Sequence, residues 1–430
     1  MSDWNEFIVA DVAAQVRNAL VGGPFGSNLV SNDYVPFGVP VIRGQNMGLG
    51  KWVAGDFVFV SEEKAQTLAA NLARPSDLIF TQRGTLGQVA IVPHGEFDRY
   101  VVSQSQMKLT VDPNKADAHF LYYYFSSREQ MEYIRQNSIQ TGVPHTNLSI
   151  LRNTPLYLPQ PDEQREIAGI LGALDDKIEL NRRTNAALEA TARALFQSWF
   201  VDFDPVRAKA EGRQPEGMDA ETAALFPYSF EESALGWIPS GWGVGTVGDE
   251  FNLVMGQSPP GETYNEIGDG LPFYQGRRDF GFRYPNQRVF CTEPTRIAEA
   301  GDTLVSVRAP VGDINMAIER CCIGRGVGAI RHITGSRSFT YYATQHLKPY
   351  FDNYNGEGTV FGSINGGDFR KLPFLIAPHS IVQTFEQIIY SLDQSIEVNE
   401  RQIVTLAQTR DALLPKLISG EVRVGELHDR

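Results

Sequence analysis

Cysteine is scarce in this chain of 430 residues, which contains only Cys291, Cys321 and Cys322. Three cysteines cannot form an even disulfide framework, and no histidine accompanies them at the spacing of a zinc site. This usage is typical of a protein in a reducing compartment. The sequence therefore predicts a cytoplasmic protein with neither disulfides nor a bound metal.

Long hydrophobic runs are also missing. No apolar run reaches the roughly 18 residues that a membrane-spanning helix needs. Residues 1–10 lack the basic and apolar regions of a signal peptide. We therefore expect a soluble chain that is not exported and has no membrane partner.

An excess of positive charge is absent as well, since the formal net charge is -13. An acidic chain argues at first against nucleic acid as a partner, because neutralising phosphates normally requires a basic surface. The acidity is concentrated in two segments with a helical pattern. Segments 1–160 and 237–378 are close to neutral, so each could present a basic face.

Catalytic motifs are missing too. No glycine-rich loop ends in Lys-Ser or Lys-Thr, the pattern that cradles nucleotide phosphates. The glycine run 324–328 lacks that lysine and favours a tight turn. Pro161 and Asp162 are not followed by the Glu-x-Lys pair of a nuclease. Segment 258–261 lacks the asparagine and the aromatic residue with which amino-methyltransferases hold a flipped base. We therefore expect no catalytic residue.

The strongest positive feature is an apolar stripe at alternating steps of four and three residues, which is typical of a coiled-coil seam. Adding 218 to each position gives a second stripe of the same kind. A core helix would explain either stripe alone, but two copies at one offset favour two paired helices in one chain. The first stripe contains Ile167, Leu171, Leu174, Ile178, Asn181, Asn185, Leu188, Ala192, Leu195 and Trp199. The second contains Phe385, Ile389, Leu392, Ile396, Asn399, Ile403, Leu406, Arg410, Leu413 and Leu417.

Both stripes have an asparagine at the fifth place, Asn181 in the first and Asn399 in the second. A polar residue in such a seam usually fixes the register of the helices at some cost in stability. The segments 174–181 and 392–399 are also similar along their whole length. One helical unit therefore occurs twice in the chain.

The globular segments repeat in outline. Trp4 and Trp242 occupy matching places, as do Arg83 and Arg308, while the sequences between such anchors differ. The predicted fold class is α+β, with two mixed α/β domains separated by two long helices that pack as an antiparallel coiled coil with an internal pseudo-two-fold repeat. The predicted parts are a first domain (1–160), a long helix (161–200), a linker or irregular crossover (201–236), a second domain (237–378), a second long helix (379–420) and a tail (421–430).

Candidate recognition residues lie in loops of both domains. Arginines can read guanine edges or grip phosphates, and amides can pair with adenine. Solvated loops and polar turns explain the same residues equally well. Arg83 and Arg308 are expected to do one job in both halves, more as a backbone grip or a loop brace than as base readers. The candidates are Arg43, Gln45, Asn46, Arg83, Gln104 and Gln106 in the first domain, and Gln275, Arg277, Arg278, Arg308 and Arg325 in the second.

Across nearly its whole length, the chain resembles the specificity subunit of type I restriction-modification enzymes. The most specific similarities are the segments 158–167, 174–181, 199–205 and 414–421. The resemblance implies two target recognition domains, each reading one half of a bipartite, asymmetric site in double-stranded DNA. It also implies that the long helices act as a ruler.

The resemblance further implies partners and no cofactor in this chain. Two methyltransferase subunits would bind the helices, and endonuclease subunits would join through the complex. S-adenosylmethionine, ATP and Mg would belong to those partners. The second helix has Arg410 in its seam and no aromatic run like that at Trp199, so the two contacts need not be equivalent. The residues expected in the coiled coil or at the partners are Ile167, Leu171, Leu174, Ile178, Asn181, Leu188, Trp199, Phe200, Leu392, Ile396, Asn399, Leu406 and Leu413.

Two alternatives remain open. Trp199 and Phe200 could cap the coiled coil instead of contacting a partner. The whole chain could also be a coiled-coil scaffold that joins two proteins without binding DNA. The net charge of -13 favours the scaffold, and the duplicated, diverged domains disfavour it.

Overall fold

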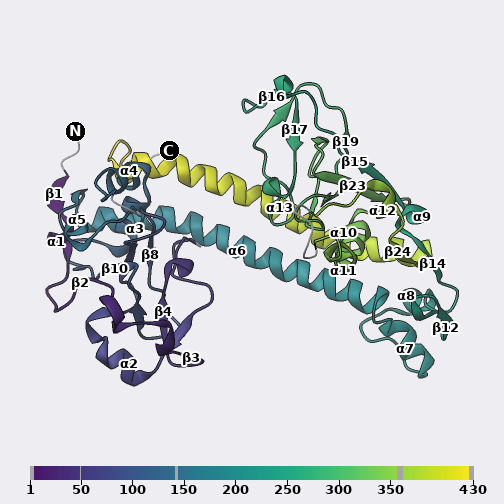
Figure 1. Cartoon of the computed structure of the whole chain (residues 1–430), viewed down its shortest axis with the longest axis horizontal. Coiled ribbons are helices and arrows are strands. Elements are labelled where there is room, and N and C mark those ends of the chain that lie inside the picture. The colour runs from purple at the N-terminus through teal and green to yellow at the C-terminus, as the bar shows by residue number, and fades with distance from the viewer. Residues whose placement is uncertain (1–3, 49, 141–143, 356–361, 426–430) are drawn as a thin grey trace. The chain divides into compact units, whose positions relative to one another are not determined.

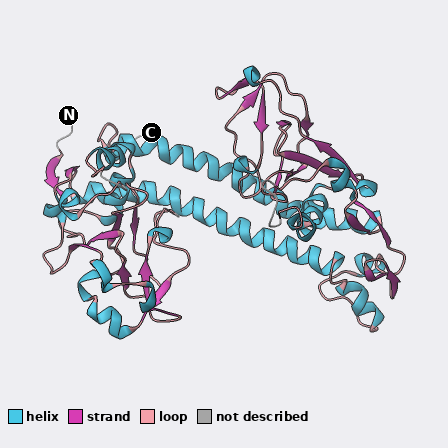
Figure 2. Cartoon of the chain, viewed as in Figure 1, coloured by secondary structure: helices cyan, strands magenta, loops and turns pink. Residues whose placement is uncertain are grey.

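The computed structural model describes residues 4–48, 50–140, 144–355 and 362–425. The chain divides into two compact units. Unit 1 comprises Met1–Glu179 with Ile403–Arg430, and unit 2 comprises Leu180–Gln402. Two long helices, α6 (Pro161–Phe200) and α13 (His379–Ile418), contribute one part to each unit and stand out in Figure 2.

The ends of the long helices follow from local sequence. Pro161 occupies the first position of α6, where its missing N–H costs no hydrogen bond. Asp162 and Glu163 in the first turn complement the positive end of the helix dipole. After α13 the chain turns at Gly420, whose φ of 70° suits a glycine that ends a helix.

Besides its parts of the two long helices, unit 1 contains three small sheets and four described helices longer than one turn. These elements can be followed in Figure 1. The pair β1 (Asn5–Ile8) and β11 (Pro155–Leu158) brings the beginning of the first domain next to its end. The four-stranded sheet has the order β2 (Leu20–Gly22), β10 (Gln106–Leu109), β7 (Leu78–Thr81) and β8 (Val89–Ile91). The five-stranded sheet has the order β3 (Tyr34–Val35), β5 (Val58–Val60), β4 (Val39–Ile42), β9 (Tyr100–Val102) and β6 (Leu72–Ala73). The helices are α2 (Glu62–Thr67), α3 (Ala118–Ser126), α4 (Arg128–Gln136) and α5 (Leu148–Arg152), and the single turn α1 (Val9–Val12) follows β1.

Unit 2 repeats these sheets with the same order of strands. The pair is β14 (Gly243–Thr246) with β24 (Pro373–Ile376). The four-stranded sheet is β15 (Phe251–Met255), β23 (Val327–His332), β20 (Thr303–Ser306) and β21 (Ile314–Met316). The five-stranded sheet is β16 (Tyr264–Asn265), β18 (Phe290–Cys291), β17 (Leu271–Tyr274), β22 (Cys321–Ile323) and β19 (Ile297–Ala298). The helices are α9 (Val247–Glu250), α10 (Arg337–His346), α11 (Lys348–Asp352) and α12 (Gly366–Arg370).

The segment 201–236 is more ordered than an irregular linker, and that expectation needs correction. It contains α7 (Asp204–Ala210), α8 (Ala220–Ala224) and β12 (Phe230–Ser233), which pairs with β13 (Gly236–Pro239). Phe203, Val206 and Phe226 are buried in the core of unit 2. The prolines and glycines concealed this pattern because the apolar residues between them have no regular spacing.

Both long helices are part of the domain cores. In unit 1, Leu171 of α6 and Leu417 of α13 share a core with Phe120 of α3. In unit 2, Phe196 of α6 and Phe385 of α13 lie 5.8 Å apart between ring centroids. Each domain is therefore packed onto segments of both long helices. Among the described residues, no helix is long and apolar enough to cross a membrane.

Polar side chains join α6 to α13 within each unit. In unit 1, Arg410 contacts Asp175 at 2.6 Å. In unit 2, the Asn181 amide donates to Gln402 at 2.8 Å, and the Asn399 amide donates to Asn185 at 2.8 Å. Within unit 2 the residue numbers increase along one helix as they decrease along the other, so the paired segments run in opposite directions.

The apolar positions of the predicted seam are all at least half-buried in the described structure. The fully buried ones include Ile167, Leu171, Ile178 and Ile396. The half-buried ones include Leu174, Leu188, Leu392, Leu406 and Leu413.

Candidate functional site

Three loops of unit 1 lie together at one edge of its sheets. The first loop (43–46) follows β4, the second (82–84) follows β7, and the third (103–105) joins β9 to β10. Because β4 and β9 are parallel, with Ile42 opposite Val102, their carboxyl ends meet at the same edge. Backbone bonds connect the loops, with Ser103 N donating to Ile42 O at 3.0 Å and Gln82 N donating to Ser105 O at 2.7 Å.

Unit 2 has the same three loops in the same places, at 275–279, 307–309 and 324–326. Strands β17 and β22 are parallel, and Gly324 N donates to Tyr274 O at 2.9 Å. Val307 N donates to Gly326 O at 2.9 Å. The matching strand order aligns the loop residues of the two units in three pairs: Arg43 with Gln275, Gln104 with Arg325, and Arg83 with Arg308.

Close backbone approach explains a glycine in these loops. A Cβ at Gly326 would lie 2.3 Å from the carbonyl oxygen of Gln275, a distance that real side chains do not tolerate. Gly326 thus lets the loops 275–279 and 324–326 touch, in agreement with the interpretation of the glycine run as a tight turn.

Three of the six polar candidates of unit 1 are exposed. Gln45, Arg83 and Gln104 face solvent, and Arg43 is half-buried. The Gln45 amide donates to Asp56 O at 3.1 Å, and that of Gln104 donates to Leu29 O at 2.9 Å. Of the two candidate arginines of unit 1, Arg83 is therefore the one that is exposed on its loop.

Asn46 and Gln106 are not available to a ligand, and their assignment as base-contacting residues needs correction. Both are 0% exposed. The Asn46 oxygen accepts from Arg43 N at 3.0 Å, and its amide donates to Ala54 O at 3.0 Å. Gln106 accepts a hydrogen bond from the Ser103 hydroxyl. These amides hold the loops in shape, and a sequence does not reveal whether a polar loop residue faces solvent or the loop's own backbone.

The candidates of unit 2 form an exposed basic group. Gln275, Arg277, Arg278, Arg308 and Arg325 are all exposed. Arg277 makes an ion pair with Asp313 at 3.0 Å. Within the described part of the chain, no carboxylate lies within ion-pair distance of the other three arginines. Exposed guanidinium groups on neighbouring loops can contact phosphates or base edges.

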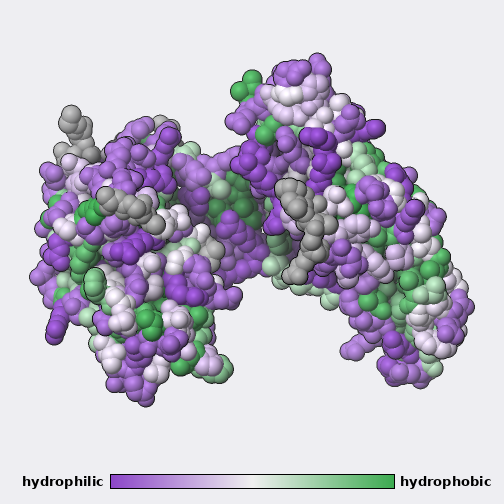
Figure 3. All heavy atoms as spheres, viewed as in Figure 1, coloured by the Kyte–Doolittle hydropathy of each residue, from purple (hydrophilic) through white to green (hydrophobic). Residues whose placement is uncertain are grey.

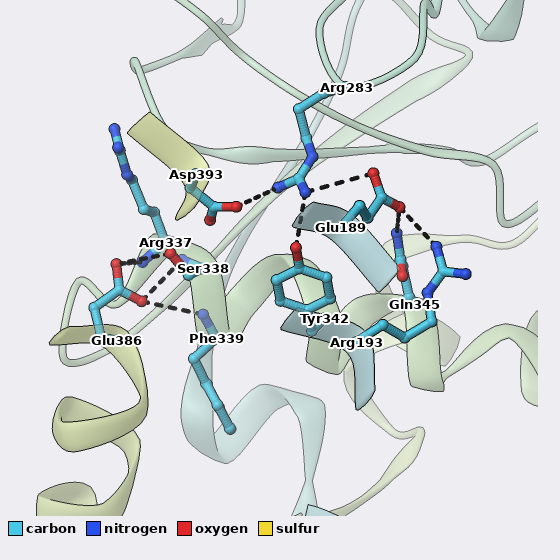
Figure 4. Close-up of polar contacts among 10 residues, drawn as sticks. All are labelled: Glu189, Arg193, Arg283, Arg337, Ser338, Phe339, Tyr342, Gln345, Glu386 and Asp393. Carbon is cyan, nitrogen blue, oxygen red and sulfur yellow. Dashed lines mark hydrogen bonds and ion pairs between the residues drawn. The ribbon is translucent and has the colours of Figure 1, made fainter. Parts of the chain in front are cut away.

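Arg283, five residues beyond Arg278, is buried, and its polar contacts are drawn in Figure 4. Its side chain is 0% exposed, and Nη1 lies 3.0 Å from Asp393 Oδ1 of α13. Nη2 donates to the Tyr342 hydroxyl at 2.8 Å and lies 3.5 Å from Glu189 of α6. Although burial opposes the charge, the neighbouring Tyr341 ring and the two carboxylates raise the pKa of Arg283 above its ordinary value. The segment that continues from the basic loop is thus bonded to both long helices.

Glu386 of α13 makes a second connection in the same region (Figure 4). Its carboxylate accepts from the backbone N–H groups of Ser338 at 2.9 Å and Phe339 at 3.1 Å. These are unpaired donors of the first turn of α10, where the side chain of Ser336 makes no capping bond. Burial raises the pKa of Glu386. Helix α13 therefore caps a helix of the domain.

Unit 1 has a matching connection through Lys51. The backbone oxygen of Lys51 accepts a hydrogen bond from Ile91 N at 2.9 Å. The backbone oxygen of Arg283 accepts one from Met316 N at the same distance, so Lys51 occupies in unit 1 the position of Arg283 in unit 2. The Lys51 ammonium lies 5.4 Å from the centre of the Tyr123 ring, whose hydroxyl donates to Asp175 at 2.7 Å. Burial lowers the pKa of Lys51. The repeat of 174–181 at 392–399 aligns Asp175 with Asp393, and that alignment is the sequence signal for both connections.

Trp199 and Phe200 do not project from α6, so their expected contact with a partner needs correction. They are 3% and 6% exposed. Trp199 packs against Phe226 with ring centroids 5.2 Å apart, and Phe200 packs against Phe385 at 5.4 Å. These rings belong to the core of unit 2, because α7 and α8 fold back over the end of α6.

Apolar side chains that do face solvent occur elsewhere on the long helices. Leu180 is 56% exposed, and Val398, which matches it in the repeat, is 64% exposed. On the visible face of unit 1, hydrophilic residues predominate and hydrophobic ones are scattered (Figure 3). An apolar residue is thus exposed at the same place in both helices.

The fold defines a protein with two alike α/β units, each carrying a set of three loops at one edge of its sheets. Residues 1–190 match the model of the type I restriction modification DNA specificity domain. The chain is 26% identical over 481 residues to the type I restriction enzyme HindI specificity subunit of Haemophilus influenzae, covering 98% of this chain and 100% of that protein. It is 23% identical over 389 residues to the type I restriction enzyme MjaIX specificity subunit of Methanocaldococcus jannaschii, covering 86% and 82%.

A crystal structure of the type I restriction-modification system S subunit from M. genitalium has the same fold. It shares 18% identity and a TM-score of 0.60, with 96% of both chains covered. Over nearly its whole length, the chain is thus similar to type I restriction enzyme specificity subunits.

Proposed function

We propose that this chain is the DNA sequence-recognition subunit of a type I restriction-modification complex and has no catalytic activity of its own. Each unit reads one half of a bipartite, asymmetric site in double-stranded DNA through its three loops. The observation that carries this proposal is the repeat of one strand order with different side chains on the matching loops. Gln275 stands where unit 1 has Arg43, and Arg325 stands where it has Gln104. Two half-sites of different sequence require this combination of a constant frame and variable loops.

The two long helices act as an antiparallel coiled coil that sets the separation of the half-sites, with an internal pseudo-two-fold repeat. Bonds between α6 and α13 in both units and the buried seam support this role. About 35 residues at 1.5 Å each give a rod of roughly 50 Å, which exceeds one DNA turn of about 34 Å. The amides of Asn181, Asn185 and Asn399 would hold the register.

The partners are two methyltransferase subunits, with endonuclease subunits joining through the complex in the cytoplasm. S-adenosylmethionine, ATP and Mg would be bound by those partners. The exposed Leu180 and Val398 support two related contacts, because they occupy one position of the repeat.

Changing Leu180 or Val398 to Glu should weaken assembly with the methyltransferase by at least tenfold, because a charge would enter an apolar contact. Both positions are exposed, so folding should be retained. Thr67→Glu adds the same charge to an exposed position of α2 and is the matched control. Assembly of both variants as tight as that of the control, measured by analytical ultracentrifugation, would exclude this surface.

A gel shift with the methyltransferase partner tests the main proposal. The complex should bind one asymmetric DNA sequence at least 1,000-fold more tightly than a scrambled duplex, as specific readers do. A stable protein complex with no preference among DNA sequences would favour the alternative of a coiled-coil scaffold that does not bind DNA. The net charge of -13 also favours that alternative.

A further inference from the structure

Three side chains that can bind a metal ion meet in unit 2, outside the three loops described above. Glu250 ends α9, His332 ends β23, and His379 begins α13. Oε2 of Glu250 lies 3.1 Å from Nε2 of His332 and 3.2 Å from Nε2 of His379. The ligand atoms of all three lie within 4.8 Å of one another.

The surroundings hold the two inner ligands in place. His332 is 1% exposed and Glu250 is 7% exposed. The other ring nitrogen of His332, Nδ1, lies 2.7 Å from the Thr334 hydroxyl. This contact orients the ring so that Nε2 points at Glu250, as outer hydrogen bonds do for histidine ligands. The Phe251 and Phe339 rings pack against His332, each with a centroid distance of 5.0 Å.

The fold itself does not require these polar groups, because unit 1 closes the same place with apolar residues. In unit 1, Asp112 N donates to Val12 O at 2.9 Å. The equivalent bond in unit 2 runs from Ile333 N to Glu250 O, also at 2.9 Å, so Val12 occupies the position of Glu250. The pairing of Ala13 with Val111 corresponds to that of Phe251 with His332, so Val111 matches His332.

The third ligand also has an apolar counterpart. The offset of 218 between the long helices aligns His379 with Pro161. In unit 1, Val12, Val111 and Pro161 therefore occupy the three positions that carry a carboxylate and two imidazoles in unit 2. All three potential ligands occur together in one unit and are absent together from the other.

We propose that Glu250, His332 and His379 bind one divalent transition-metal ion of the zinc class. Two imidazoles and a carboxylate are a ligand set that zinc accepts, and the carboxylate supplies the negative charge. Bonds of about 2.0–2.1 Å to a tetrahedral ion place the ligand atoms about 3.3 Å apart. The observed distances of 3.1 and 3.2 Å need only a small expansion. His379, whose side chain is 48% exposed, leaves a route for water to the fourth position.

The ion would fasten the first turn of α13 to two elements of the second domain. The sequence gives no sign of such a site, because the ligands are distant in the chain and follow no spacing pattern. A metal site was not expected from the cysteine and histidine usage, and the proposal departs from that expectation.

The test uses the full-length chain without an affinity tag, treated with a chelator and titrated with Co²⁺. The native chain should bind one equivalent, with the visible absorption of a four- or five-coordinate ion, and Zn²⁺ should displace it. The double variant Glu250→Val and His332→Val carries the residues of unit 1 and should lose at least tenfold in affinity. His346→Ala changes a histidine outside the cluster and should bind like the native chain.

Thermal unfolding supplies a second readout. Zn²⁺ should raise the Tm of the native chain and of His346→Ala, because an ion that binds only the folded state stabilises it. It should not raise the Tm of the double variant. If the double variant does not fold, His379→Ala decides, because that side chain is half-exposed and its loss should reduce Co²⁺ affinity without unfolding. The proposal fails if the native chain shows neither absorption nor a Tm shift, or if removing these ligands changes neither. In that case the three groups form only a hydrogen-bonded cluster.

Discussion

Arg283 and Asp393 form an ion pair of 3.0 Å in which the two side chains are 0% and 1% exposed. Arg283 lies five residues beyond Arg278 of the basic loop, and Asp393 belongs to α13. A buried pair of charges requires accurate geometry to offset the loss of hydration. This contact therefore fixes the position of the segment after the basic loop of unit 2 on the long helix.

Arg283→Met should lower the free energy of unfolding by about 3 to 5 kcal/mol, because Asp393 would be left buried without its cation. Arg320→Ala is the matched control, since its pair with Glu299 is exposed at 59% and 53%. That control should change stability by less than about 1 kcal/mol. Urea denaturation of the full chain measures both. If Arg283→Met and Arg320→Ala lowered the free energy of unfolding by the same small amount, the buried pair of Arg283 and Asp393 would not hold the segment on α13.

Arg83→Ala and Arg308→Ala should each weaken DNA binding by a similar factor for every sequence. Both arginines follow matching strands and lie on exposed loops, as expected for contacts to phosphates. Removing one phosphate contact lowers the slope of log affinity against log salt by about 1. Arg278→Ala is the comparison, because loss of a base contact relaxes one position of the site by about 1 to 3 kcal/mol. Salt titrations on matched and mismatched duplexes separate the two behaviours, and selective effects of Arg83→Ala or Arg308→Ala would contradict the phosphate assignment.

Periodicity made much of the frame predictable. The stripe from Ile167 to Trp199 and its copy 218 residues later mark the long helices α6 and α13. A spacing of 3.5 residues persists over many turns, so individual exceptions do not conceal it. The repeated Asp175 and Asp393 also indicate where each domain is bonded to a helix.

The direction in which single side chains face was not predictable. Trp199 continues an apolar seam, and nothing local shows that α7 and α8 cover it. Asn46 looks like a ligand-binding residue because polar loops are usually exposed, but its amide is bonded to backbone carbonyls. The meeting of Glu250 with His332 depends on strand pairing across the domain. Such contacts are set by tertiary packing, which a pattern within one segment does not encode.

The stability of unit 1 should depend on pH through His119, which packs edge-on against Trp52 at 5.6 Å. Burial, and then the charge of Lys51, lowers the pKa of His119 below its ordinary value of 6.5. The folded state therefore binds this proton less readily than the unfolded state. The contribution to stability is fully present above pH 6.5 and is lost as pH falls towards the folded pKa.

The Tm of the native chain should accordingly fall more between pH 7.5 and 5.5 than that of His119→Gln, whose amide does not titrate. His94→Gln alters an exposed histidine and is the control. A native profile that coincides with that of His119→Gln would show that His119 does not carry the pH dependence.

Exchange of one domain tests the independence of the two recognition units most directly. Residues 237–378 are replaced with the equivalent segment of a relative that recognises another sequence, and the hybrid is assembled with the methyltransferase. Genome-wide sequencing of methylated bases then gives the recognised site. We predict that one half of the site changes to that of the relative while the other half and the spacing between them stay the same. A change in both halves, or in neither, would contradict the division of sequence recognition between the two units.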